Sequence, residues 1–168
     1  QMAQLCGGHV IGVDITEEKL EMVSKIGAFA TVNPQKTDLV EEVMGLTDGK
    51  GADAYIDYVA TRQTLEAGLA CIGRGGKLVI VGYRPPVAYR GESSNFMVDP
   101  GSILNNGQEI HGSRYCSMAE LRQSVELVRQ GKIKPIVTQV FPLEEVETAF
   151  QMVRENKLVG RAAVVFDS

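Results

Sequence analysis

Cysteine and tryptophan are scarce in this chain: its 168 residues contain three cysteines and no tryptophan. The cysteines, Cys6, Cys71 and Cys116, are far apart and odd in number. A disulfide framework needs an even set of cysteines, and a zinc site of the CxxC type needs closely spaced pairs. The sequence therefore indicates neither kind of site, and we expect three free thiols.

Long apolar runs and an excess of basic residues are also absent. No run approaches the roughly 20 apolar residues that span a bilayer, and the first residues lack the charged, apolar and small-residue regions of a signal peptide. The formal charge is -4, with 17 Lys and Arg against 21 Asp and Glu. Because binding to nucleic acid or to a membrane surface depends on clustered positive charge, we expect neither partner and a cytoplasmic location.

What the sequence does contain is an alternation of apolar runs with segments of helical periodicity. The expected strands are residues 9–13, 29–32, 54–59, 78–81 and 109–112. The expected helices are residues 1–6, 17–26, 39–46, 61–72, 102–105 and 117–128. Such alternation predicts an α/β fold, namely a doubly wound, Rossmann-like parallel sheet with helices on both faces.

Two features interrupt this alternation. Residues 82–107 are rich in Pro, Gly, Ser and Asn, which indicates a long loop, and loops of this length in compact domains are often functional. After Gly131 the pattern changes, and a strand, a helix and a strand are expected at residues 137–141, 143–153 and 162–166. We therefore place a domain boundary near Lys132.

Asp14 is the residue with the clearest functional position. In a doubly wound dinucleotide fold, an acidic residue at the tip of the second strand binds the adenosine ribose, about 20 residues after a glycine-rich phosphate turn. Asp14 follows the first strand of this chain, so the turn would fall about six residues before residue 1. We therefore expect the sheet to lack its first strand and phosphate loop. Asp14 as an ordinary turn residue or helix cap is the alternative.

Other suggestive residues have structural interpretations. The glycines Gly73, Gly75 and Gly76 follow a helix and precede a strand, which is the wrong order for a phosphate loop, so we interpret them as a turn. His9 and His111 lack partners at metal-ligand spacing. No pattern of a catalytic triad or of paired catalytic carboxylates is present, so we predict neither catalytic nor metal-binding residues in this chain.

The ordered motifs of the chain resemble the C-terminal, cofactor-binding portion of the medium-chain, zinc-type alcohol dehydrogenases. The likeness extends over essentially the whole sequence, and the order of the motifs is more specific than any one of them. The matching segments are residues 10–20, Gly27-Ala28, Val32-Asn33-Pro34, Gly51-Ala52-Asp53, Gly75-Gly76, Val81-Gly82, Gly112-Ser113 and Val159-Gly160-Arg161.

The resemblance implies NAD as cofactor and assigns residues to its parts. Asp14 and Lys19 would approach the adenosine ribose, and Arg161 would contact the pyrophosphate unless it is an ordinary surface arginine. The strand end after residue 81 and the segment after residue 112 would lie near the nicotinamide. The complete expected set is Asp14, Ile15, Lys19, Val59, Ala60, Val81, Gly82, Tyr83, Ser113, Arg114 and Arg161.

The resemblance also implies what the chain does not contain. In this family the catalytic zinc ligands lie in an N-terminal domain, so zinc would belong to the parent enzyme and its ligands are not in this chain. Residues 1–131 would then be a partial NAD(P)-binding Rossmann domain, and residues 132–168 a segment of the GroES-like catalytic domain. The parent would act on a small alcohol or carbonyl compound as a homodimer or homotetramer, whereas this chain alone would be inactive.

Two other functions fit the same residues. A zinc-free relative, such as a quinone or enoyl reductase, shares the cofactor domain, and a truncated homologue could act without catalysis as a nucleotide-binding or dimerisation module. The residues around Asp14 also predict which cofactor is preferred. The Asp14 carboxylate favours the free ribose hydroxyls of NAD and repels the 2′-phosphate of NADP, and residues 15 and 16 are Ile and Thr rather than Arg.

Overall fold

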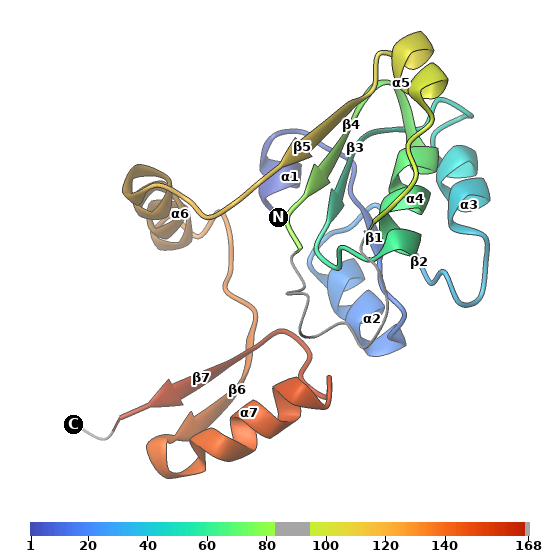
Figure 1. Ribbon diagram of the computed structural model, residues 1–168. Coiled ribbons are helices and arrows are strands. Elements are labelled where there is room, and N and C mark those ends of the chain that lie inside the picture. Colours follow the sequence, from blue (N-terminus) through green and yellow to red (C-terminus); the bar gives the residue numbers. More distant parts are fainter. Residues whose placement is uncertain (83–94, 167–168) are drawn as a thin grey trace. The chain divides into compact units, whose positions relative to one another are not determined.

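The computed structural model describes residues 1–82 and 95–166 of the chain (Figure 1). These residues divide into two compact units. The first unit consists of Gln1–Asn33 and Ser117–Ser168, and the second unit consists of Pro34–Cys116. Every strand pair is parallel, which confirms the α/β class expected from the alternating pattern.

The N-terminal part of the first unit contains α1 (Met2–Leu5), β1 (Ile11–Val13), α2 (Glu17–Lys25) and β2 (Ala30–Val32). Strands β1 and β2 pair from Ile11↔Ala30 onward, and α2 packs on them with Leu20 buried. Gly27 has a φ of 102° and ends α2, as its position predicts, because glycine adopts this conformation without the steric cost of a Cβ atom.

Strand β1 is shorter and less buried than the sequence suggested. Residues 9–13 form a continuous apolar run that is typical of a strand buried on both faces, yet β1 covers only Ile11–Val13 and Val13 is 37% exposed. Among the described strands β1 pairs with β2 alone, so one of its edges has no described partner.

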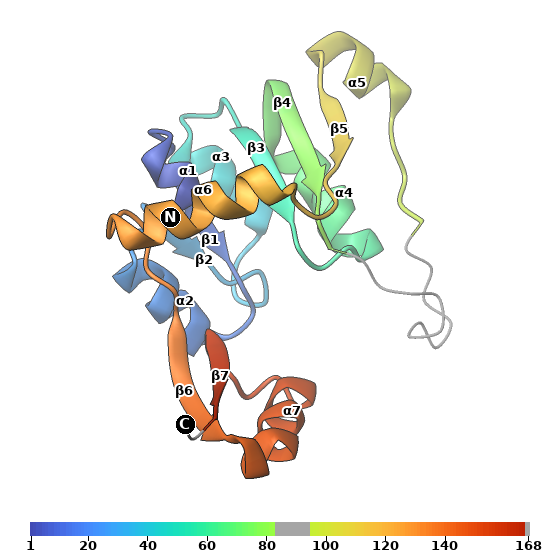
Figure 2. The same ribbon diagram turned by 90° about the vertical axis from the view of Figure 1, so that its left-hand side faces the viewer.

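The C-terminal part of the first unit contains α6 (Met118–Arg129), β6 (Val137–Pro142), the 3-10 turn η2 (Leu143–Glu145), α7 (Val146–Arg154) and β7 (Arg161–Val165). Helix α6 begins with the capping box expected from Ser117 and Glu120. Strands β6 and β7 lie side by side with α7 connecting them (Figure 2), and Phe141 and Ala149 are buried there. The strand, helix and strand expected after Gly131 are thus confirmed, whereas the domain boundary near Lys132 stays a prediction.

The second unit is built around a three-stranded parallel sheet in the order β3-β4-β5. Helix α4 packs on one face of this sheet, with α3 beside it (Figure 1), and Leu65, Ile72 and Leu78 form the buried cluster between α4 and the sheet. The elements are α3 (Leu39–Leu46), β3 (Ala52–Asp57), α4 (Arg62–Cys71), β4 (Ile72–Ile80), α5 (Pro100–Asn106) and β5 (Glu109–Gly112).

The glycines expected to form a separate turn lie inside β4. Ile72 already pairs with Ala52, and pairing resumes at Ala54↔Lys77, so residues 73–76 bulge out of a strand that had been expected to begin at residue 78. A Cβ atom on Gly73 would lie 2.0 Å from the carbonyl oxygen of Lys50. The close approach of these two backbones explains why glycine occupies the bulge.

The described strands form separate sheets rather than one continuous sheet. Strand β1 pairs only with β2, and β3 pairs only with β4, among the residues that the structure describes. The expectation that the sheet lacks its first strand stays a prediction.

Candidate functional site

Asp14 and Ile15 follow the carboxyl end of β1. The Asp14 Oδ1 atom accepts a hydrogen bond from the Thr16 amide at 2.9 Å, so the side chain stabilises the turn into α2, as the alternative interpretation expected. Oδ2 has no partner among the described residues and keeps its capacity to accept hydrogen bonds. Ile15 is 53% exposed. This strand end therefore presents one available carboxylate oxygen beside an exposed apolar side chain.

Lys19 lies on the first turn of α2, and its ammonium group donates to the Asn156 Oδ1 atom at 2.6 Å. Asn156 follows the end of α7 with a φ of 54°. Asparagine tolerates this left-handed conformation at the end of a helix, so the residue type is a local signal for a helix end. The contact between Asn156 and Lys19 has no such local signal, because 137 residues separate the two.

A second group of expected residues gathers at the carboxyl ends of β3, β4 and β5. Asp57, Ile80 and Gly112 are aligned by the pairing of the three strands. Val81 and Gly82 both donate backbone hydrogen bonds to the Asp57 carbonyl oxygen at 2.8 Å, and the Ser113 amide donates to the Ile80 carbonyl at 2.9 Å. This edge is where open α/β sheets bind ligands.

Asp57 is a residue of this edge that the sequence did not point to. It is only 3% exposed, and its Oδ1 atom accepts hydrogen bonds from the Val59 amide at 2.6 Å and the Ala60 amide at 2.8 Å. Ala60 consequently has a φ of 56°, a conformation that costs an L-residue about 1–2 kcal/mol. The only signal in the sequence is an aspartate at the end of a strand, which by itself indicates a turn.

The electrostatic effect of Asp57 extends to Tyr55 on the same strand. Burial raises the pKa of the Tyr55 hydroxyl to about 12, and the negative charge of Asp57 adds to the increase. The Asp57 Oδ2 atom is itself buried, and no described group donates a hydrogen bond to it. The carboxyl end of β3 therefore carries a buried carboxylate oxygen that no described group satisfies.

Gly82 allows β3 and β4 to approach each other closely at their ends. A Cβ atom at this position would lie 2.5 Å from the Tyr58 carbonyl carbon and 2.7 Å from the Val59 nitrogen. Real Cβ atoms do not come so close, so any other residue would push the two backbones apart. The requirement for glycine at position 82 is therefore steric, and it does not depend on the family resemblance.

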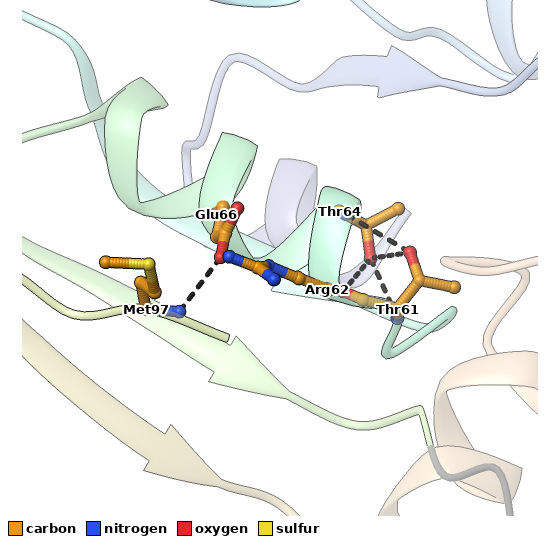
Figure 3. A network of polar contacts seen from close by, with 5 residues as sticks. All are labelled: Thr61, Arg62, Thr64, Glu66 and Met97. Atoms are coloured by element: carbon orange, nitrogen blue, oxygen red, sulfur yellow. Dashed lines mark hydrogen bonds and ion pairs between the residues drawn. The ribbon is translucent and has the colours of Figure 1, made fainter. Parts of the chain in front are cut away.

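Helix α4 begins at Arg62, with Thr61 as its N-cap (Figure 3). Thr61 and Thr64 form a reciprocal capping box. On the next turn, the Glu66 carboxylate accepts hydrogen bonds from the Met97 amide and from Arg62, and these bonds lower the pKa of Glu66. The cap anchors the end of the loop that carries Val59 and Ala60.

The remaining expected residues are more dispersed. Arg114 places its guanidinium group 4.9 Å from the centre of the Tyr115 ring. Arg161 is the first residue of β7, and its amide donates to the Ile136 carbonyl at 2.8 Å. Arg161 is exposed in the first unit. Tyr83 lies outside the described residues. The structure thus brings Val59, Ala60, Val81, Gly82 and Ser113 together in one unit, while Asp14, Ile15, Lys19 and Arg161 belong to the other.

The described residues do not fit a zinc site. No group of three or more His, Cys, Asp or Glu side chains within residues 1–82 and 95–166 could hold a metal ion. The thiols of Cys6 and Cys116 are exposed and that of Cys71 is buried, and all three are free. In the same part of the chain, no helix is both long and apolar enough to cross a membrane.

Comparisons with known proteins give matches over most of the chain. A family model described as zinc-binding dehydrogenase matches residues 1–130. An NAD-dependent alcohol dehydrogenase of Sulfurisphaera tokodaii is 34% identical over 160 residues, which are 95% of this chain and 44% of that protein. The crystal structure of the alcohol dehydrogenase of Aeropyrum pernix is 28% identical, with a TM-score of 0.79, over 94% of this chain and 43% of that one.

A zinc-type alcohol dehydrogenase-like protein of Schizosaccharomyces pombe is 29% identical to this chain, and the match covers 99% of this chain and 47% of that protein. The chain therefore spans about half the length of the relatives that it matches. The family model, in contrast, covers most of the chain. The chain belongs to the zinc-binding dehydrogenase family, as its resemblance to the zinc-type alcohol dehydrogenases predicted.

Proposed function

We propose that this chain is the cofactor-binding part of an NAD-dependent, zinc-type alcohol dehydrogenase. The observation that carries the proposal is the alignment of the carboxyl ends of β3, β4 and β5, with Val81 and Gly82 hydrogen-bonded to Asp57. This edge is the one on which doubly wound folds bind dinucleotides. The NAD-dependent relative of Sulfurisphaera tokodaii supports the choice of cofactor.

Each part of the dinucleotide has a proposed partner. The available Asp14 oxygen and the Lys19 ammonium bind the adenosine ribose, and Arg161 binds the pyrophosphate, for which a guanidinium fork is well suited. Val59 and Ala60 lie beside the cofactor. The proposed cofactor-binding residues also include Ile15, Val81, Gly82, Tyr83, Ser113 and Arg114.

The observations on these residues fit a bound dinucleotide. Asp14 keeps one oxygen without a described partner, and Gly82 lies close to the backbone of residues 58–59. When bound, NAD supplies the acceptor or donor of a hydride. The chain's own residues bind and orient the cofactor.

The substrate and the metal are proposed for the parent protein rather than for this chain. The relatives are alcohol dehydrogenases, so we propose a small alcohol or carbonyl compound as substrate. The described residues include no group of three or more side chains that could hold a metal ion, and zinc is proposed for the parent protein. A cytoplasmic location is proposed on the sequence alone.

Self-association is proposed through β5. This strand pairs only with β4 among the described strands, and all four of its residues are exposed. An unpaired edge is a template for pairing with another chain, and a symmetric contact between two such edges closes as a dimer. We propose a homodimer, or a homotetramer built from it.

Calorimetric titration of the intact protein that carries this chain tests the proposed function. We expect NAD to bind, and to bind more tightly than NADP. In Gly82→Ala the new Cβ atom collides with the end of β3, so NAD should bind at least tenfold more weakly. The matched control is Gly45→Ala, where nothing lies within 4 Å of a Cβ atom. Absence of NAD binding, or equal binding by both variants, would refute the proposal.

A further inference from the structure

Asp57 is the residue on which both halves of the candidate cofactor edge depend. Its side chain folds the strand-end loop (residues 58–60), and its backbone carbonyl accepts hydrogen bonds from Val81 and Gly82. One residue of β3 therefore holds the loop that follows β3 and the segment that follows β4. No other residue described at this edge makes contacts of both kinds.

The two segments also touch each other. The position of a Cβ atom on Gly82 lies 2.7 Å from the Val59 nitrogen, and Val59 is the first of the two amides that the Asp57 carboxylate binds. Release of the Val59 amide would let the strand-end loop move away from Gly82. Ala60 is held at a φ of 56°, which is unfavourable for alanine. The loop would therefore relax to another conformation once the Val59 amide is released.

We propose that Asp57 is a positioning residue of the cofactor site, which acts through the strand-end loop without touching the cofactor itself. The carboxylate is 3% exposed, so it lies beneath the surface on which a dinucleotide would bind. Its role is to hold the strand-end loop (residues 58–60) in the conformation that places Val59 against Gly82. This inference rests on the proposed function, since it specifies how one wall of that site is built.

The two oxygens of Asp57 make a selective test possible. Oδ1 accepts both amide hydrogen bonds, whereas Oδ2 has no partner among the described residues. Asparagine retains an oxygen in the Oδ1 position and can form the same turn. Alanine offers no acceptor, and serine mimics such turns only weakly. The three substitutions therefore separate the effect of losing the turn from the effect of losing the negative charge.

The experiment measures the dissociation constant of NAD by calorimetry for the intact protein and its Asp57→Asn, Asp57→Ser and Asp57→Ala variants. We expect Asn to bind NAD within threefold of the unmutated protein, Ser to bind it several-fold more weakly, and Ala at least tenfold more weakly. The rescue by Asn is the readout that distinguishes positioning by the turn from contact through charge.

Asp38 provides the matched control. Its Oδ1 atom also accepts two amide hydrogen bonds, from Val40 at 2.9 Å and Glu41 at 3.0 Å, but at the start of α3. Asp38→Ala should lower the melting temperature without changing the dissociation constant of NAD. A loss of affinity in Asp57→Ala but not in Asp38→Ala therefore separates positioning from general destabilisation.

Several outcomes would overturn the inference while leaving the proposed function intact. One is unchanged NAD affinity in Asp57→Ala, and another is an equal loss in Asp57→Asn and Asp57→Ala. If the Ala variant does not fold, unchanged affinity in Asp57→Ser overturns the inference instead. Failure of the unmutated protein to bind NAD would refute the proposed function itself, so the two failures are distinguishable.

Discussion

Replacement of Asp14 by alanine in the intact protein tests the assignment of the adenosine ribose to the end of β1. The change removes the carboxylate oxygen that has no described partner, and with it the proposed acceptor for a ribose hydroxyl. It also removes the hydrogen bond from the Thr16 amide to Oδ1. The first loss concerns the cofactor, and the second concerns the start of α2.

The structure sets the size of the expected effect. Because Oδ1 is already engaged with Thr16 at 2.9 Å, we count one charge-assisted hydrogen bond from Oδ2 to the ribose. Such a bond contributes about 1.5–3 kcal/mol, which corresponds to about 10- to 150-fold in the dissociation constant of NAD. NADP should bind Asp14→Ala as well as, or better than, the unmutated protein, since the like charge facing its 2′-phosphate is gone.

Calorimetric titration of both cofactors measures the change in preference. Asp14→Asn is the control for the turn, because its amide oxygen can still accept from the Thr16 amide, and it should lose NAD affinity without loss of stability. Lys19 stays in place in every variant, so its attraction to phosphate cancels in the comparison. Equal or tighter binding of NADP than of NAD by the unmutated protein would refute the assignment of Asp14 to the ribose.

Three further predictions concern the core, the sheet edge and the thiols. Leu78→Ala removes a fully buried side chain and should lower the free energy of unfolding by about 2–5 kcal/mol; a loss below 1 kcal/mol in urea denaturation would contradict the packing described. Ile110→Lys places a charge on the free edge of β5 and should yield monomers in analytical ultracentrifugation, so an unchanged dimer would argue against that interface. Burial raises the pKa of the Cys71 thiol to about 11, so peptide mapping after iodoacetamide treatment at pH 8 should show Cys71 unmodified and Cys6 and Cys116 alkylated. The stabilisation linked to the protonated Cys71 thiol is fully present below its ordinary pKa of 9.0 and is lost as the pH rises toward 11, which a pH series of thermal melts would detect as a falling melting temperature.

Much of the fold could be predicted because its signals are local. The capping box of Ser117 and Glu120 and the left-handed Gly27 act within one or two helical turns. The same holds for Asp14, which is recognisable because it directly follows a strand.

The sequence by itself thus determined the α/β class, most of the elements and the end of β1 as a ribose-binding candidate. Only the tertiary structure decided that Asp57 organises the ends of β3 and β4, that Asn156 binds Lys19, and that residues 73–76 are a bulge within β4 rather than a turn before it. The physical reason is that each of these contacts joins backbones or side chains far apart in the sequence. Periodicity and capping report on neighbours within a few residues, whereas such contacts exist only once parallel strands have paired and helices have packed on them.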